Sequence, residues 1–390
     1  MARKTKGDTG LNIQDYRKKI DEIDDNLVRL FEERMDVAAA IADYKKANSM
    51  PVKDPAREKE KVLDVLDKTR DDLKEYTPLL FQVLFELSRS YQTRRNGAET
   101  ELTDQIKAAI EQTPSMIPDS PSVACQGIAG ANSQAACEKL FRYPKTFFCS
   151  SFEAVFSAIE TGLCTYGVIP LENSNAGSVN KVYDLMMKHR FYVVRSIRLK
   201  VRHNLLCKPG AELSDIKEIY SHEQAISQCS DFLQTLKNVR VIPCENTAVA
   251  AKMVADSDRK DIAALASEQC ESQYGLKCIR KSVQNTDNNY TRFICIAKKL
   301  EIYPGANRTS LMMTLPHEQG SLFKMLSRFY ALGINLNKLE SRPLPDREFE
   351  FMFYFDLDTP VYSPNLTQLI GELQNSCDFF QYLGSYSEVI

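Results

Sequence analysis

The segment from residue 11 to residue 50 constrains the fold most. It contains neither Gly nor Pro, and Gly10 and Pro51 bracket it. Its apolar residues recur in alternating steps of three and four, the spacing of a heptad seam: Ile13, Tyr16, Ile20, Ile23, Leu27, Leu30, Val37, Ile41 and Tyr44. The pattern predicts one helix about 50 to 55 Å long, at about 1.5 Å per residue. A helix longer than a small domain needs a partner for its seam, so we expect a dimer.

Two further helices are predicted by their start signals. Asp54-Pro55 and Thr77-Pro78 each have the pattern of an N-cap followed by a first-turn proline. The third helix is expected to end near Asn96-Gly97. A polar helix to about Thr113 and the proline-rich stretch 114–121 follow. We therefore expect an all-α domain over 11–100 and a linker over 101–121.

From Ser122 onward, short β-branched or apolar runs alternate with helix-like segments, which is typical of an α/β domain. The runs are SVACQ, TFFCS, YGVIPLE, IYSHE, VRVIP, AALAS and RFICIAKK. The long segment from Phe191 to Cys207 lies midway and is expected to carry the chain between two lobes. This predicts a two-lobed domain over 122–301, with ligands bound at the carboxyl ends of strands.

After Pro304-Gly305 the predicted element order is βαββαβ, the split-βαβ arrangement of ferredoxin-like folds. We expect this module over 305–388, with a regulatory or dimerising role. Only a few residues join it to the α/β domain. A chain ending near Leu300 is therefore expected to keep the activity of that domain but to lose its inhibition by an effector.

Composition excludes several function classes. The chain has 50 basic and 52 acidic residues among 390, which predicts no nucleic-acid or membrane partner. Its eleven cysteines include no C-x-x-C pair and are accompanied by only four histidines, so neither a metal nor another cofactor is expected. No apolar run could cross a bilayer. We expect a cytoplasmic protein with reduced, buried thiols.

Several polar side chains of the helical region form a candidate anion site. Arg34 occupies a seam position where an apolar side chain is expected, which is costly unless an anion meets it. Lys45 is only about 20° further around the same helix, whereas Arg17 is about 100° away and could serve a partner's site instead. A structural ion pair at Arg34 is the alternative interpretation.

The neighbouring helices add further candidates, each with a structural alternative. Asp54 could be only a cap, and Glu58 could only complement the helix dipole. Ser88 and Gln92 share one face of the third helix and could be merely solvated.

Residues 12 to 95 resemble the all-helical chorismate mutases, which form intertwined dimers. The resemblance rests on YRKKIDEID, LFEER, YKK, PVKDPAREKE and the Ser88–Gln92 pair. It implies carboxylate binding by Arg17 of the other protomer, Arg34 and Arg57, and donation to the substrate's ether oxygen by Lys45 and Gln92. It assigns the substrate's hydroxyl and a carboxylate to Asp54, Glu58 and Ser88.

Those residue types suit the chemistry. Chorismate is a dianion, which guanidinium groups bind in a bidentate manner. The rearrangement is unimolecular, and negative charge grows on the breaking ether oxygen, so preorganised donors there favour the transition state. Neither a nucleophile nor a metal is required.

Residues 122 to 299 resemble prephenate dehydratases, with a fold similar to type II periplasmic binding proteins. The motifs are GIAGANSQAA, IPLENSNAGSVNKVYDLM, YSHEQAISQC and NYTRF. The resemblance implies that Thr291 is catalytic. It implies a prephenate site built from Asn173, Ser174, Ser221, Gln228, Thr291, Arg292 and Phe293. Ile128 and Glu223 stand where the family usually has proline, and Asn173 and Thr291 also have ordinary structural interpretations as a cap and a strand residue.

Residues 308 to 386 resemble ACT-type amino-acid-binding modules. The resemblance rests on HEQGSLFKMLSRFYALGINLNKLESRP. It implies that phenylalanine, as feedback inhibitor, binds at two motifs: Gly320, Ser321 and Leu322, and Glu340, Ser341, Arg342 and Pro343. Gly320 could also be only a tight-turn glycine. The three segments in this order resemble the bifunctional chorismate mutase/prephenate dehydratases of phenylalanine biosynthesis, as homodimers or larger homo-oligomers.

Two other functions remain possible from the sequence. A non-catalytic amino-acid sensor would have no need for both the Arg/Lys/Gln set and Thr291. A mutase fused to prephenate dehydrogenase would need a G-x-G-x-x-G loop, and around Gly127 and Gly130 the middle glycine is missing.

Overall fold

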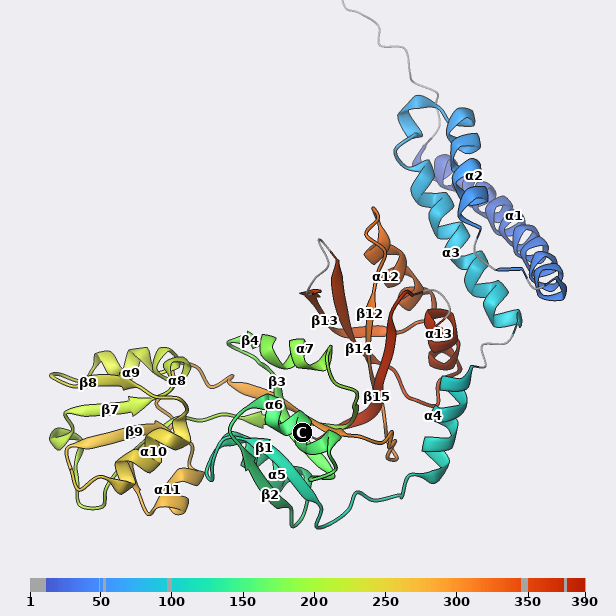
Figure 1. The fold of residues 1–390 in the computed structure, drawn as a ribbon. Coiled ribbons are helices and arrows are strands. Elements are labelled where there is room, and N and C mark those ends of the chain that lie inside the picture. Colours follow the sequence, from blue (N-terminus) through green and yellow to red (C-terminus); the bar gives the residue numbers. More distant parts are fainter. Residues whose placement is uncertain are drawn as a thin grey trace, which may run out of the picture. The chain divides into compact units, whose positions relative to one another are not determined.

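The computed structural model describes residues 12–48, 50–51, 54–96, 100–344, 350–374 and 377–389. The chain divides into two compact units (Figure 1). One contains the first three helices together with residues 318–333 and 367–376, and the other contains residues 101–317, 334–366 and 377–390. Each is considered by itself.

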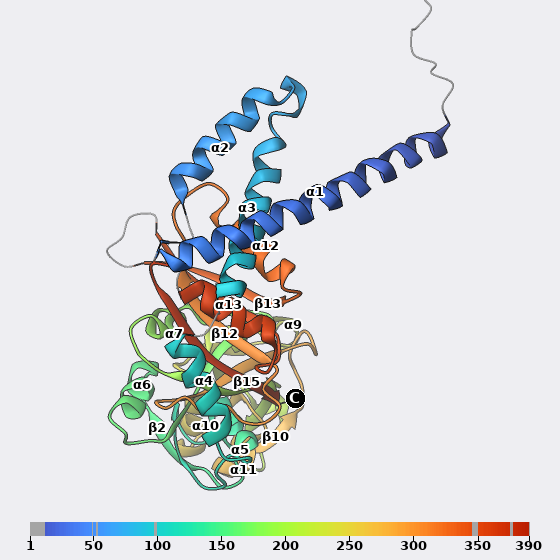
Figure 2. The same cartoon turned by 90° about the vertical axis from the view of Figure 1, so that its right-hand side faces the viewer.

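The predicted long N-terminal helix is confirmed as α1 (Ile13–Ala47). The Asn12 side chain accepts hydrogen bonds from the backbone N–H groups of Gln14 and Asp15, and the Asp15 carboxylate accepts from the Asn12 N–H at 3.0 Å. This reciprocal cap fixes the start of the helix. Figure 2 shows the N-terminal part of α1 extending beyond α2 and α3.

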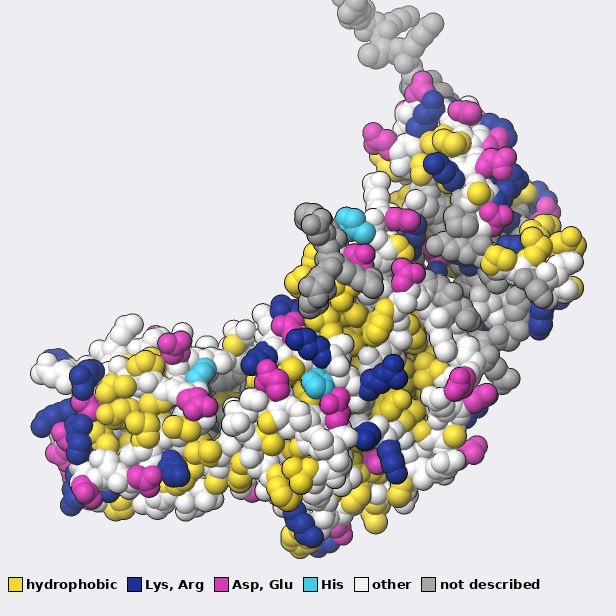
Figure 3. Space-filling view, viewed as in Figure 1, with side chains coloured by type: hydrophobic (Ala, Val, Ile, Leu, Met, Phe, Trp, Pro, Cys, Tyr) yellow, Lys and Arg dark blue, Asp and Glu magenta, His cyan; other side chains and the backbone are white. Residues whose placement is uncertain are grey.

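The heptad seam of α1 is exposed along its length. Ile20, Leu27 and Tyr44 are 56%, 56% and 65% exposed. The buried residues of α1 are the small Ala38, Ala39 and Ala42, and its main helical neighbour is α3. In a single chain the apolar seam is therefore exposed to solvent. Figure 3 shows hydrophobic side chains on the surface of the helical part.

The Asp54-Pro55 start signal is confirmed. At Thr77-Pro78 the third helix does begin, but Thr77 is its first residue, and the threonine hydroxyl donates to the Leu73 carbonyl at 3.1 Å instead of capping the helix. In α2 (Pro55–Lys68) the Asp54 side chain caps the helix by accepting from the Arg57 N–H at 3.1 Å. A short 3₁₀ turn, η1 (Asp71–Leu73), leads to α3 (Thr77–Asn96). Gly97, which was expected to mark the end of α3, lies outside the described residues.

The polar helix expected to end at about Thr113 is confirmed, and it occupies the first half of the stretch 101–121 that was expected to be a linker. Residues 101–112 form α4 (Glu101–Gln112), whose Thr103, Ile106 and Ala109 are buried. Just after the helix, Thr113 Oγ1 accepts a hydrogen bond from the Ile302 N–H at 3.0 Å. The apolar stripe of α4 makes it part of the α/β unit rather than a free connection.

The middle region has the predicted two lobes, each with its own sheet. In the first lobe the chain forms β1 (Ser122–Gln126), α5 (Asn132–Leu140), β2 (Lys145–Cys149), α6 (Phe152–Glu160), β3 (Tyr166–Asn173), β4 (Gly177–Ser178), α7 (Asn180–Met186) and β5 (Tyr192–Lys200). The second lobe contains β6 (Asn204–Cys207), η2 (Leu213–Asp215), β7 (Glu218–Ser221), α8 (Glu223–Gln228), α9 (Ser230–Gln234), β8 (Arg240–Pro243), α10 (Thr247–Asp256), β9 (Ile262–Ala266), α11 (Gln269–Tyr274) and β10 (Lys277–Arg280). The chain then returns to the first lobe as β11 (Tyr290–Ala297).

The sheet order explains why these strands are so apolar. The second lobe has a five-stranded sheet in the order β10-β6-β9-β7-β8, and every residue of its central strand β9 is buried. Strands covered on both faces have continuous apolar runs rather than alternating ones. As predicted, the segment 191–207 carries the chain from one sheet to the other. Of the helices that the structure describes, none has the length and apolarity of a membrane span.

The predicted βαββαβ order of the C-terminal region is confirmed. Its elements are β12 (Arg308–Thr314), α12 (Ser321–Ala331), β13 (Asn335–Pro343), β14 (Phe351–Asp358), α13 (Pro364–Gln374) and β15 (Phe380–Val389). The expectation of a self-contained module is not met, because most of α12 and α13 group with the first helices and the strands group with the α/β region.

The C-terminal strands continue the sheet of the first lobe. The ten-stranded sheet has the order β13-β14-β12-β15-β5-β11-β3-β1-β2, with β4 paired to β3. The junction is the parallel pairing of residues 387–389 with residues 195–197. Met312, Tyr354 and Tyr386 belong to the same hydrophobic core as Phe156 and Phe191. The strands therefore share a core with the α/β region.

Gly384 makes the junction possible. It has a φ of +133°, and a Cβ at this position would lie 2.3 Å from the Val193 carbonyl oxygen on β5. A side chain would push β15 away from β5 at the point where the two parts of the sheet meet.

The shared core changes the expected effect of truncation. A chain ending at Leu300 would expose the apolar face that Met312, Tyr354 and Tyr386 cover, so we expect loss of cooperative unfolding of the α/β region, measured by calorimetry. Gly384→Ala should lower the free energy of unfolding by about 3 kcal/mol for the same reason. An unchanged melting transition in both variants would contradict a shared core.

Candidate active sites

Two antiparallel strands bring Asn173 and Thr291 together. Asn173 ends β3, Thr291 lies in β11, and the strand register places them opposite each other. Asn173 Nδ2 donates to Thr291 Oγ1 at 2.9 Å and to Asn289 Oδ1 at 2.8 Å. Asn173 is only 9% exposed. The two residues predicted on separate motifs are therefore in direct contact.

The orientation of the Asn173 amide is fixed by the backbone. Its Oδ1 accepts hydrogen bonds from the N–H groups of Asn175 and Ala176, both at 3.0 Å. Backbone N–H groups can only donate, so the NH₂ end of the amide has to face Thr291. Thr291 Oγ1 then accepts from Asn173, and its own proton is left to donate to another group.

The hydrogen bonds continue from Asn289 into the second lobe. Asn289 Nδ2 donates to Gln228 Oε1 at 3.0 Å, and His203 Nε2 lies 3.0 Å from the same oxygen. Since that oxygen only accepts, the His203 proton has to be on Nε2. Burial lowers the pKa of His203, against the opposing effect of the Gln228 hydrogen bond.

These contacts add residues that sequence reasoning missed. Asn289 opens the NYTRF motif, two residues before Thr291, so its position was a usable signal. His203 is one of four histidines and stands in no motif. Only the fold places it beside Gln228.

The two predicted serines have different surroundings. Ser174 Oγ donates to the Asn288 carbonyl at 2.8 Å and accepts from the Tyr290 N–H at 3.0 Å, so it holds the segment before Thr291. Ser221 is fully buried in the second lobe, where its hydroxyl donates to the Leu265 carbonyl at 2.8 Å. The structure brings Ser174 to the Asn173–Thr291 pair but uses the Ser221 hydroxyl elsewhere.

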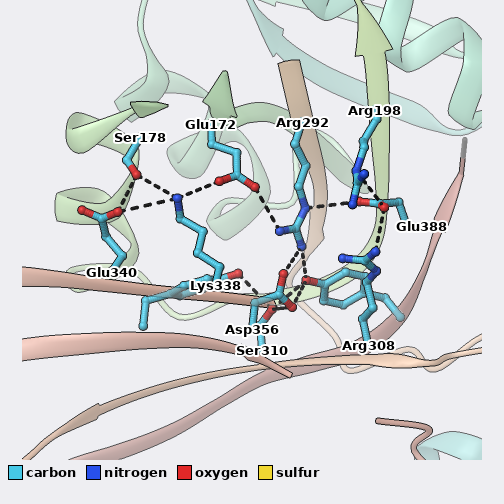
Figure 4. A network of polar contacts seen from close by, with 12 residues as sticks. Glu172, Ser178, Arg198, Arg292, Arg308, Ser310, Lys338, Glu340, Asp356 and Glu388 are labelled. Atoms are coloured by element: carbon cyan, nitrogen blue, oxygen red, sulfur yellow. Dashed lines mark hydrogen bonds and ion pairs between the residues drawn. The ribbon is translucent and has the colours of Figure 1, made fainter. Parts of the chain in front are cut away.

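Arg292 and Phe293 are not brought to this cluster. Phe293 is buried in a hydrophobic core with Val168 and Tyr166. Arg292, 5% exposed, pairs instead with Asp356 at 2.5 Å and Glu172 at 3.3 Å. Figure 4 shows this guanidinium among carboxylates from β3 and the C-terminal strands. Adjacent residues of a strand point to opposite faces, which separates Arg292 from Thr291.

In the helical unit, Arg34 meets α3. Its Nη1 donates to Ser88 Oγ in a short hydrogen bond and to the Leu84 carbonyl at 3.1 Å. The guanidinium carbon lies 5.9 Å from the centre of the Phe85 ring. Partial burial lowers the pKa of Arg34. Arg34 and Ser88, predicted on different helices, are therefore joined.

Gln92 lies one helical turn after Ser88 on α3. It is buried, and among the described residues its Oε1 has no hydrogen-bond partner. A 180° flip of the amide exchanges oxygen and NH₂ at nearly the same positions. A buried amide oxygen without a partner leaves this end of the side chain available to a ligand.

Glu58 has a partner that sequence reasoning missed. Arg89 on α3 forms short ion pairs with both Glu58 on α2 and Glu86. Glu86 in turn pairs with Arg328 of α12 at 2.9 Å. Arg89 is one residue past Ser88, but no spacing rule in the sequence points to Glu58.

The other predicted residues of this site belong to α1 and to the start of α2. Asp54 caps α2, and the exposed Arg57 pairs with Glu60 at 2.6 Å. Lys45 is half-buried on α1, and Arg17 is exposed near the start of the same helix. Within one chain the structure joins Arg34 to Ser88 but shows no contact of Arg17 with them among the described residues.

The two expected effector motifs lie on different elements. Gly320, with a φ of +81°, precedes α12, and Ser321 and Leu322 begin that helix. Residues 340–343 end β13, where burial alternates along the strand. Glu340 forms a short hydrogen bond with Ser178, and Arg342 pairs with Asp184 at 2.9 Å. Ser341 and Pro343 are exposed on the other face.

No arrangement of His, Cys, Asp and Glu that could hold a metal ion is found in the described parts of the chain. The polar groups of the two sites are hydroxyls, amides and charged side chains. Such groups bind and orient organic anions and donate protons to leaving oxygens.

Comparison with known proteins finds two family matches, over the two regions in which these residues lie. Residues 16–93 match the family described as chorismate mutase type II, and residues 123–301 match the family described as prephenate dehydratase. The chain is 30% identical over 381 residues to the bifunctional chorismate mutase/prephenate dehydratase of Escherichia coli (strain K12), covering 95% of both chains. It is 37% identical over 276 residues to arogenate dehydratase/prephenate dehydratase 2, chloroplastic, of Arabidopsis thaliana, covering 68% of this chain and 72% of that one.

A solved structure supports the fold of the α/β and C-terminal regions. Prephenate dehydratase from Arthrobacter aurescens, in complex with L-Phe, matches with a TM-score of 0.62 at 24% identity, over 68% of this chain and 90% of that one. The near-complete match to the E. coli protein includes both enzymatic regions. The chain therefore belongs to the family of bifunctional chorismate mutase/prephenate dehydratases, enzymes of phenylalanine biosynthesis.

Proposed function

We propose that the helical site around Arg34 and Ser88 rearranges chorismate to prephenate, and that Thr291 and Asn173 act in the conversion of prephenate to phenylpyruvate. The observation that carries the second assignment is the fixed direction of the Asn173–Thr291 hydrogen bond. It leaves the threonine O–H pointing away from Asn173, where it can donate a hydrogen bond to a substrate oxygen.

In the mutase reaction, Arg34 would bind a chorismate carboxylate, with Arg57 and Arg17 of a second chain as further anion contacts. Gln92 and Lys45 would donate to the ether oxygen as its bond breaks. Gln92 is buried, so its hydrogen bond acts in a region of low dielectric, where it is stronger than in water. Glu58, held by Arg89, would bind the substrate's hydroxyl and a carboxylate together with Asp54 and Ser88.

In the dehydratase reaction, the carbon–carbon bond to the ring carboxylate breaks and supplies the electrons that make the ring aromatic. The ring hydroxyl leaves at the same time and has to take up a proton to depart as water. Thr291 is too weak an acid to give up its proton alone, so it would donate a hydrogen bond and relay a proton from solvent. Asn173 would hold its oxygen in place.

A second copy of the chain is the proposed partner of α1. The exposed seam from Ile13 to Tyr44 has the heptad spacing that pairs helices. Arg17 lies on this extended part of α1 and has no contact with Arg34 within one chain among the described residues. An intertwined dimer would cover the seam and bring Arg17 to the partner's site.

We also propose phenylalanine as a feedback inhibitor bound by the C-terminal region through Gly320, Ser321 and Leu322 and through residues 340–343. The related A. aurescens dehydratase is known in complex with L-Phe. The positive φ of Gly320 begins α12 and leaves backbone N–H groups at its N-terminus, where a carboxylate is favoured.

The two activities should separate by mutation. Arg34→Ala is expected to lower mutase turnover at least about 100-fold, because an anion contact made in the transition state is lost. Dehydratase activity on supplied prephenate should persist. Thr291→Ala should have the reverse effect. Both rates are measured on the same folded, full-length chain, and loss of both activities from either change would contradict separate sites.

Mixing two inactive variants tests the shared site. If Arg17 completes the partner's site, heterodimers of Arg17→Ala and Arg34→Ala chains contain one intact site, and mutase activity should reappear in the mixture after subunit exchange. The Arg34→Ala chain mixed with itself is the control. A mixture that stays inactive, although heterodimers are detected by mass spectrometry, would argue that each site is built from one chain.

Gly320→Val is expected to raise the phenylalanine concentration for half-inhibition of the dehydratase at least about tenfold, since a β-branched residue is strained at its positive φ. Gly333→Ala is the matched control. It also has a positive φ, at the other end of α12, with open space around it. Calorimetry should show phenylalanine binding lost in the first variant only. Unchanged inhibition in Gly320→Val would place the effector site elsewhere.

A further inference from the structure

The strand pair that carries the dehydratase site has a second, buried polar face. Next to the Asn173–Thr291 pair in the register of β3 and β11 stands the pair Glu172–Arg292. Side chains alternate along strands, so this second pair faces away from the site. Arg292 Nη1 lies 3.3 Å from Glu172 Oε1. Each of the two site residues is thus the chain neighbour of a member of an ion pair.

Carboxylates of the C-terminal strands enclose the Arg292 guanidinium. Arg292 Nη2 lies 2.5 Å from Asp356 Oδ2 on β14 and donates to the Tyr386 hydroxyl on β15 at 2.8 Å. Its Nε is 3.5 Å from Glu388. Asp356 is fully buried. A charge in this position can be tolerated only while its partners remain in place.

A lysine of β13 reaches the other end of the same ion pair. Lys338 Nζ donates to Glu172 Oε2 at 2.6 Å and to Ser178 Oγ at 2.9 Å. It also lies 3.6 Å from Glu340 on its own strand. Figure 4 shows Lys338 between Glu340 and Glu172, with Arg292 on the far side of Glu172. Charged groups of β13, β3, β11 and β14 thus form one continuous row.

We propose that Lys338, Glu172 and Arg292 are positioning residues of the dehydratase, through which the C-terminal strand β13 holds Asn173 and Thr291 in register. The inference rests on the proposed dehydratase role of Thr291. None of the three touches the Asn173–Thr291 face. Glu172 and Arg292 act through the backbones of β3 and β11, and Lys338 of β13 acts through Glu172.

The charges explain why Lys338 is decisive. Burial tends to raise the pKa of Glu172, but Lys338 and Arg292 outweigh it and the net pKa is lowered, so the carboxylate stays charged. Removing the Lys338 ammonium would leave two carboxylates, Glu172 and Glu340, near each other with no cation between them. Glu172 would then be drawn toward Arg292 alone, and the end of β3 that carries Asn173 would move with it. Displacements of about 1 Å at a reacting group can cost about 100-fold in rate.

The test measures steady-state dehydratase kinetics of full-length Lys338→Met without phenylalanine. A fall in kcat of about tenfold or more, with KM within about twofold, is expected, because geometry at Thr291 is altered while anion binding is not. Lys338→Arg should restore kcat to within about threefold, since it keeps the charge and the donors. Mutase activity of the same chain is the internal control and should not change.

Asp184→Asn is the matched interface control. It breaks the ion pair between α7 and Arg342 on the same face of β13, but Asp184 touches neither Glu172 nor Arg292 among the described contacts. It should leave dehydratase kcat unchanged. If Asp184→Asn reduces kcat as much as Lys338→Met does, general loosening of the interface is responsible and the positioning role is wrong.

Glu172→Gln decides the matter if Lys338→Met does not fold. The glutamine keeps the shape of the side chain, but it removes the charge and replaces one of the two acceptor oxygens by an NH₂ donor. We expect the same fall in kcat without a change in KM. Unchanged kcat in a folded Lys338→Met or Glu172→Gln chain overturns the proposal. Since Thr291→Ala independently tests the site itself, failure of that variant to lose activity would overturn the proposed site rather than the positioning role.

Discussion

The antiparallel pairing of β3 with β11 is the constraint on which the rest of the α/β region depends. One register fixes two pairs at once: Asn173 opposite Thr291 on one face, and Glu172 opposite Arg292 on the other. A slip by one residue would exchange the faces, placing a guanidinium in the site and a threonine among buried carboxylates. The chemistry of the site and the attachment of the C-terminal strands are therefore set by the same hydrogen bonds.

Attaching the C-terminal strands buries charged side chains, which costs free energy unless each charge has a partner of opposite sign. Four cations, Arg198, Arg292, Arg308 and Lys338, face four carboxylates, Glu172, Glu340, Asp356 and Glu388. Removing one partner from a buried pair costs about 3 to 5 kcal/mol, because the other charge is left without compensation. Burial raises the pKa of Asp356 despite the neighbouring Arg292. The ten-stranded sheet and its common hydrophobic core hold these charges together, which is why the C-terminal strands do not form a separate body.

The helical region also contains a partly buried charge, the Arg34 guanidinium. Arg34 occupies a seam position, and the structure gives it the hydroxyl of Ser88, a backbone carbonyl and an aromatic face, but no carboxylate among its hydrogen-bond partners in the described residues. A guanidinium that is partly desolvated without a counter-ion is well suited to an anionic ligand. Glu58 differs from Arg34 in this respect, because it already has a charged partner, Arg89, within the same chain.

The local elements could be read from the sequence. The Gly- and Pro-free heptad segment predicted α1, the Asp-Pro and Thr-Pro signals predicted the next two helices, and the apolar runs predicted the strands, because each depends on residues near one another in the chain. The motifs likewise identified Arg34, Ser88, Asn173 and Thr291. Their contacts across helices and strands then followed in the structure.

Only the tertiary structure decided what depends on distant residues. The sequence offered Arg292 and Phe293 as part of the prephenate site, but strand alternation and the C-terminal carboxylates take the arginine away from it. Asn289, His203 and Arg89 became visible only once separate segments met. The C-terminal strands were expected to form a module separate from the α/β domain, but β15 pairs with β5. The two strands are about 190 residues apart in the chain, so no local sequence pattern encodes this contact.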